Sequence, residues 1–305
     1  GEVAQSKSLI RLAESALRLA SASDEAFVIV DPDVARSREH DPSLIPKMEQ
    51  ALERQEFRLH YQVKIGAKFR TVVGAEALIR WYDAALKKIL PPAAFIEVAE
   101  NSSLIEPLTD FIIRSAIGRC VRWRDPTSVA VNVTPRLLET KNLVSVVGDA
   151  LDFYGLGANR LTIEITERGT LANRALANIE AIRDLGVKIS IDDFGTGQCS
   201  LTYFRDLPAD QIKIDRTFVQ AMGKSKKDNA IVRGMIDLAH HCEMEVVAEG
   251  VEDERTADEL ANMDCDVLQG YWLGKPMAAD KFEAEFMGDF GAADTDPDLF
   301  SNLLQ

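Results

Sequence analysis

Polar side chains interrupt a series of apolar stretches, each at or near the point where the stretch ends. A single residue of this kind could begin a turn in water. Lys, Glu and Asp are seldom buried without partners, however, so a repeated pattern within apolar surroundings indicates a common site. The members of the series, in chain order, are Asn132, Glu164, Asp192, Asp193, Lys213, Glu249 and Gln269.

An earlier stretch, 71–81, adds Glu76, Leu78 and Arg80, which share one face of a strand because side chains alternate with a period of two. Glu76 could bind a cation, and the guanidinium of Arg80 could bind a phosphate through two hydrogen bonds. The alternative is a surface ladder of opposite charges, which the apolar neighbours disfavour.

The candidate metal ligands among these residues offer only oxygen donors, from carboxylate and amide groups, which suit Mg²⁺ or Mn²⁺ and suit zinc poorly. They are Glu76, Asn132, Glu164, Asp192, Asp193 and Glu249. Carboxylates gathered in a low dielectric would repel one another unless divalent ions were bound. Two such ions roughly 3.5 to 4 Å apart form the arrangement for attack of water on a phosphodiester. The residues therefore predict a two-metal hydrolytic site.

Strands and helices alternate along the chain, which predicts helices covering a parallel sheet. The expected helices are 43–54, 104–123, 137–153, 171–185, 230–241 and 254–263. The expected strands are 57–65, 71–81, 128–133, 160–166, 187–192, 210–214, 245–249 and 266–272.

The count of eight strands, and the absence of GxGxxG after the first, favour a TIM-like (β/α)8 barrel over an open doubly wound sheet. Because the first two strands form a hairpin, one strand is expected to be antiparallel. In a parallel barrel the carboxyl ends of the strands meet at one face, where active sites lie. The polar series is expected to meet there.

The chain has 305 residues and a net charge of −14, so its field repels DNA and RNA, and an anionic ligand would need bound cations. Neither a membrane span nor a signal peptide is recognisable, and we expect no membrane contact from this stretch of chain. The four cysteines form no CxxC pair, which fits a reducing cytoplasm.

Three regions are expected. Residues 1–42 form a short helix-strand linker or the remnant of a preceding domain, 43–290 form the barrel, and 291–305 form an acidic tail. The start at Gly1 is consistent with a piece of a longer signalling protein, which could itself carry a membrane anchor.

Seven ordered motifs resemble the EAL domain family, and the resemblance covers about 43–286. The family is named after the Glu-Ala-Leu at 76–78. The first motif, the opening of the domain, has two segments: Tyr61-Gln62 and Glu76-Ala77-Leu78-Ile79-Arg80-Trp81. The other six are Val131-Asn132-Val133-Thr134-Pro135, Glu164-Ile165-Thr166-Glu167, Asp192-Asp193-Phe194-Gly195-Thr196-Gly197, Ile212-Lys213-Ile214-Asp215, Ala248-Glu249-Gly250-Val251-Glu252 and Gln269-Gly270-Tyr271.

The resemblance implies a barrel that hydrolyses cyclic di-GMP to linear 5'-pGpG with two Mg²⁺ or Mn²⁺ ions, and that forms a homodimer through the helix after Asp215 and its loop. By the resemblance, Lys213 orients or deprotonates the attacking water with help from Gln269. The remaining roles fall into four groups: Glu76, Asn132, Glu164 and Asp192 on the first metal; Asp192, Asp193 and Glu249 on the second; Gln62, Leu78 and Arg80 on the substrate; Glu167, Phe194, Gly195, Thr196, Gly197 and Glu252 in a regulatory loop and its anchors.

Three residues depart from the family pattern: Gln198 and Cys199 replace Tyr and Ser, and Val63 replaces Pro. These departures bear on the loop, and they leave open a second reading, an EAL domain that binds cyclic di-GMP without cutting it. An unrelated glycosidase barrel would explain paired acids but not Asn132 and Lys213. Residues 9–33 are similar to the closing helix and strand of a GGDEF domain, with a plain linker helix as the alternative.

Overall fold

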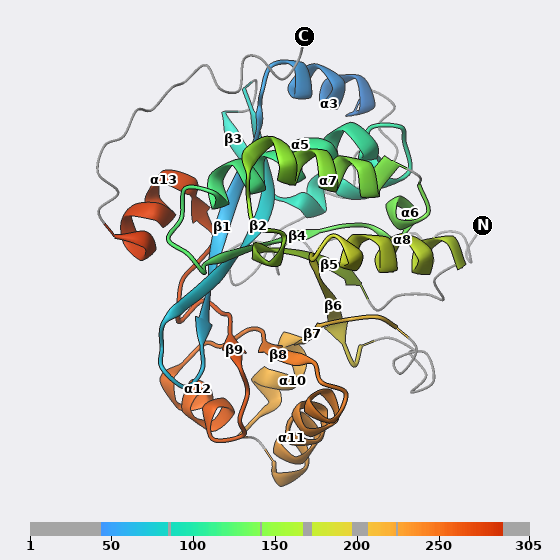
Figure 1. The fold of residues 1–305 in the computed structure, drawn as a ribbon. Coiled ribbons are helices and arrows are strands. Elements are labelled where there is room, and N and C mark those ends of the chain that lie inside the picture. The colour runs from blue at the N-terminus through green and yellow to red at the C-terminus, as the bar shows by residue number, and fades with distance from the viewer. Residues whose placement is uncertain are drawn as a thin grey trace, which may run out of the picture.

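The computed structural model describes residues 44–84, 87–140, 142–166, 173–196, 207–223 and 225–288. Its centre is a closed barrel of eight strands with helices around it (Figure 1). The barrel strands are β1 Phe57–Gly66, β2 Val72–Asp83, β4 Ser128–Asn132, β5 Leu161–Thr166, β6 Lys188–Phe194, β7 Gln211–Ile214, β8 Glu245–Ala248 and β9 Val267–Leu268.

The barrel closes through β1, which pairs with β2 on one side and with β9 on the other. Both of these pairings are antiparallel. The other six pairings in the ring are parallel: β2 with β4, β4 with β5, β5 with β6, β6 with β7, β7 with β8, and β8 with β9. Two short strands lie outside the ring: β3 Lys88–Leu90 pairs with β2, and β10 Met277–Ala278 pairs with β1. The predicted TIM-like barrel with one antiparallel strand is confirmed.

The helices pack their apolar faces on the outside of the barrel. In Figure 1, α5 and α7 lie side by side near β1 to β4, while α10 and α11 lie near β7 and β8. Helix α5 shows the pattern clearly, since Leu108, Ile112 and Ala116 are buried at helical spacing. The α-helices are α3 Leu44–Glu53, α4 Ile96–Glu100, α5 Ile105–Cys120, α6 Pro135–Leu138, α7 Asn142–Tyr154, α8 Asn173–Asp184, α10 Arg216–Ala221, α11 Lys226–His241, α12 Glu254–Ala261 and α13 Ala279–Phe282. There are also two short 3-10 helices, η1 Pro92–Ala94 and η2 Ala158–Arg160, and a π-helix, η3 Glu283–Met287.

Aromatic side chains cover the outer face of β1. Tyr61 contacts Trp123 and Phe282 with ring centroids 5.3 and 5.8 Å apart, and Phe57 contacts Trp81 at 5.6 Å. These residues are nearly inaccessible to solvent, so the odd-numbered positions of β1 face the helices. The even-numbered positions, including Gln62 and Lys64, consequently face the barrel interior.

Two predicted helices differ from the structure by more than the trimming of their ends: one is broken in two, and one starts earlier. The helix expected over 137–153 is two helices: α6 ends at Leu138, and α7 begins at Asn142. Pro135 occupies the first turn of α6, where its missing N–H costs nothing, so the first helix begins before the expected start. The helix expected from 230 begins at Lys226, because the Ser225 side chain accepts a hydrogen bond from Asp228 N and caps it.

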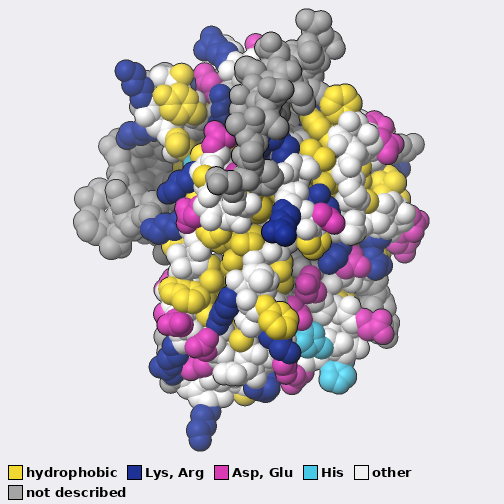
Figure 2. Space-filling model, turned by 60° about the vertical axis from the view of Figure 1, so that its left-hand side comes forward, with side chains coloured by type: hydrophobic (Ala, Val, Ile, Leu, Met, Phe, Trp, Pro, Cys, Tyr) yellow, Lys and Arg dark blue, Asp and Glu magenta, His cyan; other side chains and the backbone are white. Residues whose placement is uncertain are grey.

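The expected linker at 1–42 and the expected tail at 291–305 lie outside the described residues. Within the described part of the chain, no helix is both long and apolar enough to cross a bilayer. Figure 2 shows one face on which apolar, acidic and basic side chains are interspersed, with no continuous basic area among the coloured residues.

Candidate functional site

Each of the eight barrel strands, or the residue directly after it, brings a polar side chain to the same mouth, and the polar series in the sequence accounts for all of them except Gln62 on β1. The backbone register places Asn132 beside Glu164, and Gln62 of β1 opposite Glu76 of β2. Gln269 follows β9 directly and donates its backbone N–H to Ala248 O, the last residue of β8. Strand ends that are far apart in the sequence therefore meet at one end of the barrel.

Lys213 stands at the centre of this mouth, with its side chain 1% exposed. Its Nζ lies 2.7 Å from Glu249 Oε1, 2.9 Å from Glu164 Oε2, 3.0 Å from Asp192 Oδ1 and 3.5 Å from Glu76 Oε2. Four carboxylates from four strands or their ends thus gather within 3.5 Å of one cationic atom. The arrangement stabilises positive charge at this point.

Glu76 is held by two amide side chains. Asn132 Nδ2 donates to Glu76 Oε1 at 2.7 Å, and Gln269 Nε2 donates to Glu76 Oε2 at 2.6 Å. Gln269 Nε2 also reaches Gln62 Oε1 at 3.1 Å, and Gln62 Nε2 donates to Gly274 O. Because these amides donate through nitrogen, their oxygens are left as acceptors, and the buried Gln269 Oε1 has no hydrogen-bond partner among the described residues.

Lys64 belongs to the same cluster, although the sequence analysis does not single it out. Its Nζ lies 2.6 Å from Glu164 Oε1, and both side chains are almost completely buried. The available signal is a lysine between Val63 and Ile65 in a strand, two residues after Gln62. A lysine at such a position is seldom buried without a partner.

Burial and charge move the pKa values of the site in opposite directions. Burial raises the pKa of Glu249 to about 8 despite Lys213, with Asp192 and Glu76 adding repulsion. Burial also raises the pKa of Glu76. Burial by itself would raise the pKa of Glu164, but Lys213 and Lys64 lower it to about 2. Burial would lower the pKa of Lys213, but the four carboxylates raise it well above its usual value.

The stability of the metal-free protein is expected to fall as the pH rises towards 8. Glu249 has a usual pKa of 4.5 and a folded-state pKa of about 8, so between these values the folded state binds a proton that the unfolded chain has released. Urea unfolding in a chelator should show a loss of roughly 2 kcal/mol from pH 6 to pH 8. Glu249→Gln, which cannot titrate, should show a smaller loss, and an equal loss in both proteins would contradict this assignment.

A cavity of about 390 Å³ opens above the cluster. Predicted site residues form much of its wall: Gln62, Glu76, Leu78, Asp192, Asp193, Lys213, Glu249, Glu252 and Gln269. Its wall also includes residues that the sequence analysis does not assign to the site: Asp215, Arg216, Gln220, Gly250, Gly270 and Tyr271.

Arg80 is not part of the cavity wall, although it shares a strand face with Glu76 and Leu78. It is half-buried, and its Nη1 donates to Ile79 O at 2.9 Å. Burial lowers the pKa of Arg80, and the charges of Glu76 and Tyr271 oppose this. The guanidinium therefore lies within electrostatic reach of the cavity wall.

Gly270 cannot carry a side chain in this wall. A Cβ atom there would lie 2.1 Å from Val251 O and 2.2 Å from Val251 N, so the backbone would have to shift. Gly270→Ala should destabilise the protein by roughly 1 to 3 kcal/mol. Gly234→Ala in α11, where nothing lies within 4 Å, should instead stabilise it by about 0.5 to 1 kcal/mol. Urea unfolding of both variants checks this, and an unchanged stability of Gly270→Ala would contradict it.

Four of the predicted loop and anchor residues lie within the described chain. Phe194 is buried, and Thr196 Oγ1 donates a hydrogen bond to Asp193 O at 2.9 Å. Gly195 has a φ of 95°, and a Cβ atom at this position would collide with the side chains of Met235 and Phe218. Glu252 Oε1 accepts a hydrogen bond from Gln220 Nε2 at 2.7 Å. Glu167, Gly197, Gln198 and Cys199 lie outside the described residues.

The described Asp, Glu, His and Cys side chains do not form a group of three or more that is arranged to hold a metal ion. The carboxylates point instead to Lys213 Nζ, which already supplies a cation to their oxygens. The donor set fits Mg²⁺ or Mn²⁺ in its chemistry, because it consists of carboxylate and amide groups that gather around positive charge.

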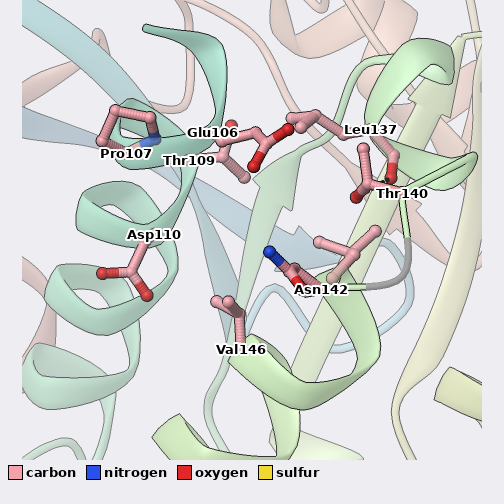
Figure 3. A pocket seen from close by; sticks show the side chains of 9 residues that line it. Glu106, Pro107, Thr109, Asp110, Leu137, Thr140, Asn142 and Val146 are labelled. Atoms are coloured by element: carbon pink, nitrogen blue, oxygen red, sulfur yellow. Dashed lines mark hydrogen bonds between the residues drawn. The ribbon is translucent and has the colours of Figure 1, made fainter. Parts of the chain in front are cut away.

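A second hollow, of about 340 Å³, lies outside the barrel between α5, α6 and α7 (Figure 3). Glu106 and Asp110 of α5 line it, opposite Asn142 and Val146 of α7. Asp110 Oδ1 already accepts a hydrogen bond from Arg114 Nε at 2.7 Å. The hollow contains none of the predicted site residues, whereas the cavity at the mouth of the barrel is lined by many of them, so the mouth is the candidate site.

Comparisons with known proteins agree with this geometry. A family model described as the EAL domain matches residues 46–276. An uncharacterized signaling protein of Caulobacter vibrioides is 39% identical over 250 residues, which cover 81% of this chain and 30% of that protein. The bifunctional diguanylate cyclase/cyclic di-GMP phosphodiesterase MucR of Pseudomonas aeruginosa is 36% identical, covering 79% of this chain and 36% of MucR. The chain thus spans about a third of the length of these curated relatives.

Solved structures give the same result. The PaMucR phosphodiesterase in complex with c-di-GMP has a TM-score of 0.74 and 34% identity, covering 79% of this chain and 99% of that one. The EAL enzyme Bd1971 bound to cAMP and cyclic di-GMP has a TM-score of 0.76 and 32% identity, covering 80% and 68%. The matched family model, the barrel and the residues at its mouth together show that this chain belongs to the EAL domain family.

Proposed function

We propose that this chain hydrolyses cyclic di-GMP to linear 5'-pGpG in the presence of Mg²⁺ or Mn²⁺. The observation that carries the proposal is the gathering of Glu76, Glu164, Asp192 and Glu249 around one cationic atom beneath a 390 Å³ cavity. An acidic site of this kind suits an anionic dinucleotide only when cations accompany it. Relatives whose names or titles include cyclic di-GMP support the choice of substrate.

The proposed ligands of one ion are Glu76, Asn132, Glu164 and Asp192, and those of a second are Asp192, Asp193 and Glu249. Two divalent ions supply an activated water and neutralise charge on the phosphodiester. No imidazole takes part in this set, so carboxylate oxygens and the Asn132 amide oxygen provide the protein donors.

The other residues of the mouth orient and bind. Lys213 keeps its proton among four carboxylates, so its role is to orient the attacking water and stabilise negative charge rather than to accept a proton. Gln269 has an amide fixed through nitrogen and a buried oxygen free to accept, which suits it to orient the same water. Gln62 and Leu78 form part of the cavity wall and are proposed to contact the substrate. Arg80 lies outside that wall but on the same strand face as Leu78, and its proposed role is to pair with a phosphate.

The test is product analysis by mass spectrometry. The purified chain is incubated with cyclic di-GMP and Mg²⁺ or Mn²⁺, and a product heavier than the substrate by one water is expected. An excess of chelator should stop the reaction. Intact substrate after prolonged incubation with each ion would contradict the proposal.

A second candidate is a receptor that binds cyclic di-GMP without cutting it. The observation in its favour is that the carboxylates point to Lys213 and not to a preformed metal position. Tight binding of cyclic di-GMP with intact ligand in Mn²⁺ would select this reading. The expected homodimer and the expected cytoplasmic location stay predictions, and light scattering of the purified chain checks the first.

A further inference from the structure

The side chain of Lys64 crosses the interior of the barrel. Lys64 lies on β1, and its partner Glu164 lies on β5, with β2 and β4 between these strands in the ring. The 2.6 Å contact between Lys64 Nζ and Glu164 Oε1 therefore spans positions that are not neighbours in the sheet. Both side chains are buried, at 6% and 0% exposure, so neither charge is compensated by bulk water.

Small residues on the intervening strands leave room for this crossing. Gly74 of β2 lies directly opposite Lys64, and Ala130 of β4 lies opposite Glu76. Opposite residues of neighbouring strands point to the same face of a sheet, so Gly74 presents no side chain to the interior at the level of Lys64. A Cβ atom at Gly74 would lie 2.6 Å from Ser128 Oγ of β4, so a larger residue does not fit at this level of the barrel.

The two lysines share Glu164 unequally. Lys213 Nζ lies within 3.5 Å of four carboxylates, whereas the ion pairs of Lys64 within the described chain reach Glu164 alone. Lys213 therefore cannot fix the orientation of Glu164 independently of its other partners. Lys64 holds Oε1, and Oε2 accepts a hydrogen bond from Lys213 Nζ, around which the other three acids gather.

We propose that Lys64 is a positioning residue, which holds Oε1 of Glu164 so that Oε2 is presented to a divalent cation at the mouth of the barrel. The inference rests on the proposed function for the identity of the cation. It adds a second buried ammonium group to the site, one that acts through Glu164 and touches no substrate. With all four carboxylates ionised, the four acids and two lysines carry a formal charge of −2, which one divalent cation neutralises.

The test is a double-mutant cycle on Mn²⁺ binding, measured by electron paramagnetic resonance without nucleotide. Lys64→Met should weaken Mn²⁺ binding by roughly 10- to 100-fold, as loss of a partner of a metal ligand does. In the Glu164→Gln background the same substitution should change the affinity less than about twofold, because Glu164 no longer needs to be held. Lys64→Arg keeps the charge and should recover part of the binding.

The sign of the effect separates positioning from simple electrostatics. Removal of a positive charge by itself strengthens cation binding, so tighter binding of Mn²⁺ by Lys64→Met would overturn the inference. An equal weakening in both backgrounds would also overturn it. If Lys64→Met does not fold, Lys64→Gln takes its place in the same cycle. Lys188→Met is the matched control: Lys188 lies on β6, is half-exposed and pairs loosely with Glu245 at 3.7 Å, so the affinity should not change.

The result also separates this inference from the proposed function. If the unaltered chain binds Mn²⁺ and leaves cyclic di-GMP intact, hydrolysis is contradicted and the cycle still decides the role of Lys64. If the unaltered chain binds no Mn²⁺, both are contradicted.

Discussion

Glu76→Ala should lose roughly 10²- to 10⁴-fold of the rate of cyclic di-GMP hydrolysis, the equivalent of several kcal/mol of charge stabilisation in the transition state. Glu76 receives hydrogen bonds from Asn132 at 2.7 Å and from Gln269 at 2.6 Å, so its loss frees two further side chains of the mouth. The measurement is the initial rate of product formation in saturating Mn²⁺. Glu76→Gln keeps the volume but offers one oxygen instead of two, and it should lose activity to a similar degree.

Glu245→Gln is the matched control for Glu76. Glu245 begins β8 at the opposite end of the barrel, where its Oε2 accepts a hydrogen bond from Gln211 Nε2 at 2.8 Å. This variant keeps a polar group of equal size and lies far from the mouth along its strand, so its rate should remain within about twofold of the parent. A Glu76→Ala protein that hydrolyses the dinucleotide as fast as the parent would exclude Glu76 from the reaction.

The second large effect is expected at Lys213, whose removal leaves four carboxylates together without their shared cation. Breaking a buried ion pair by removing one partner costs about 3 to 5 kcal/mol, so metal-free Lys213→Met should unfold at much lower urea concentration than the parent. Mn²⁺ should restore a large part of this stability, since it replaces the missing positive charge. Hydrolysis should stay low in Mn²⁺, because the group that orients water is absent.

A stability difference that shrinks at low pH would support this account, because protonated carboxyls no longer repel one another. The control is Lys188→Met, a half-exposed lysine on β6 that lies 3.7 Å from Glu245, and it should cost less than about 1 kcal/mol. A Lys213→Met protein with the stability of the parent in chelator would show that the carboxylates do not depend on this ammonium. Full activity of the variant would remove Lys213 from the proposed mechanism.

The two lysines differ in how far the sequence could predict them. Lys213 stands out because it lies between two isoleucines at the end of a strand, in a series with Glu164, Asp192 and Glu249. Lys64 belongs to the antiparallel strand of the hairpin, whose carboxyl end lies at the other end of the barrel. Reading polar residues at the carboxyl ends of strands therefore finds Lys213 and passes over Lys64.

The amino-acid sequence by itself determined the eight strands, most of the long helices, the antiparallel hairpin and the acids of the mouth. It could do so because each of these features depends on local periodicity: alternation within a strand, helical spacing, or a polar residue that ends an apolar stretch. Seven motifs in order also fixed the family. Each of these signals is contained in a short run of consecutive residues, whatever the rest of the chain does.

The tertiary structure alone decided which groups pair. It placed Lys64 on Glu164 across 100 positions of sequence, Asn132 on Glu76 across 56, and Asp215, Arg216 and Tyr271 in the wall of the cavity. It also decided that Glu164 and Glu249, both glutamates at strand ends, have pKa values of about 2 and about 8. The physical reason is that burial and the distance to other charges set these properties, and both exist only once the barrel has closed.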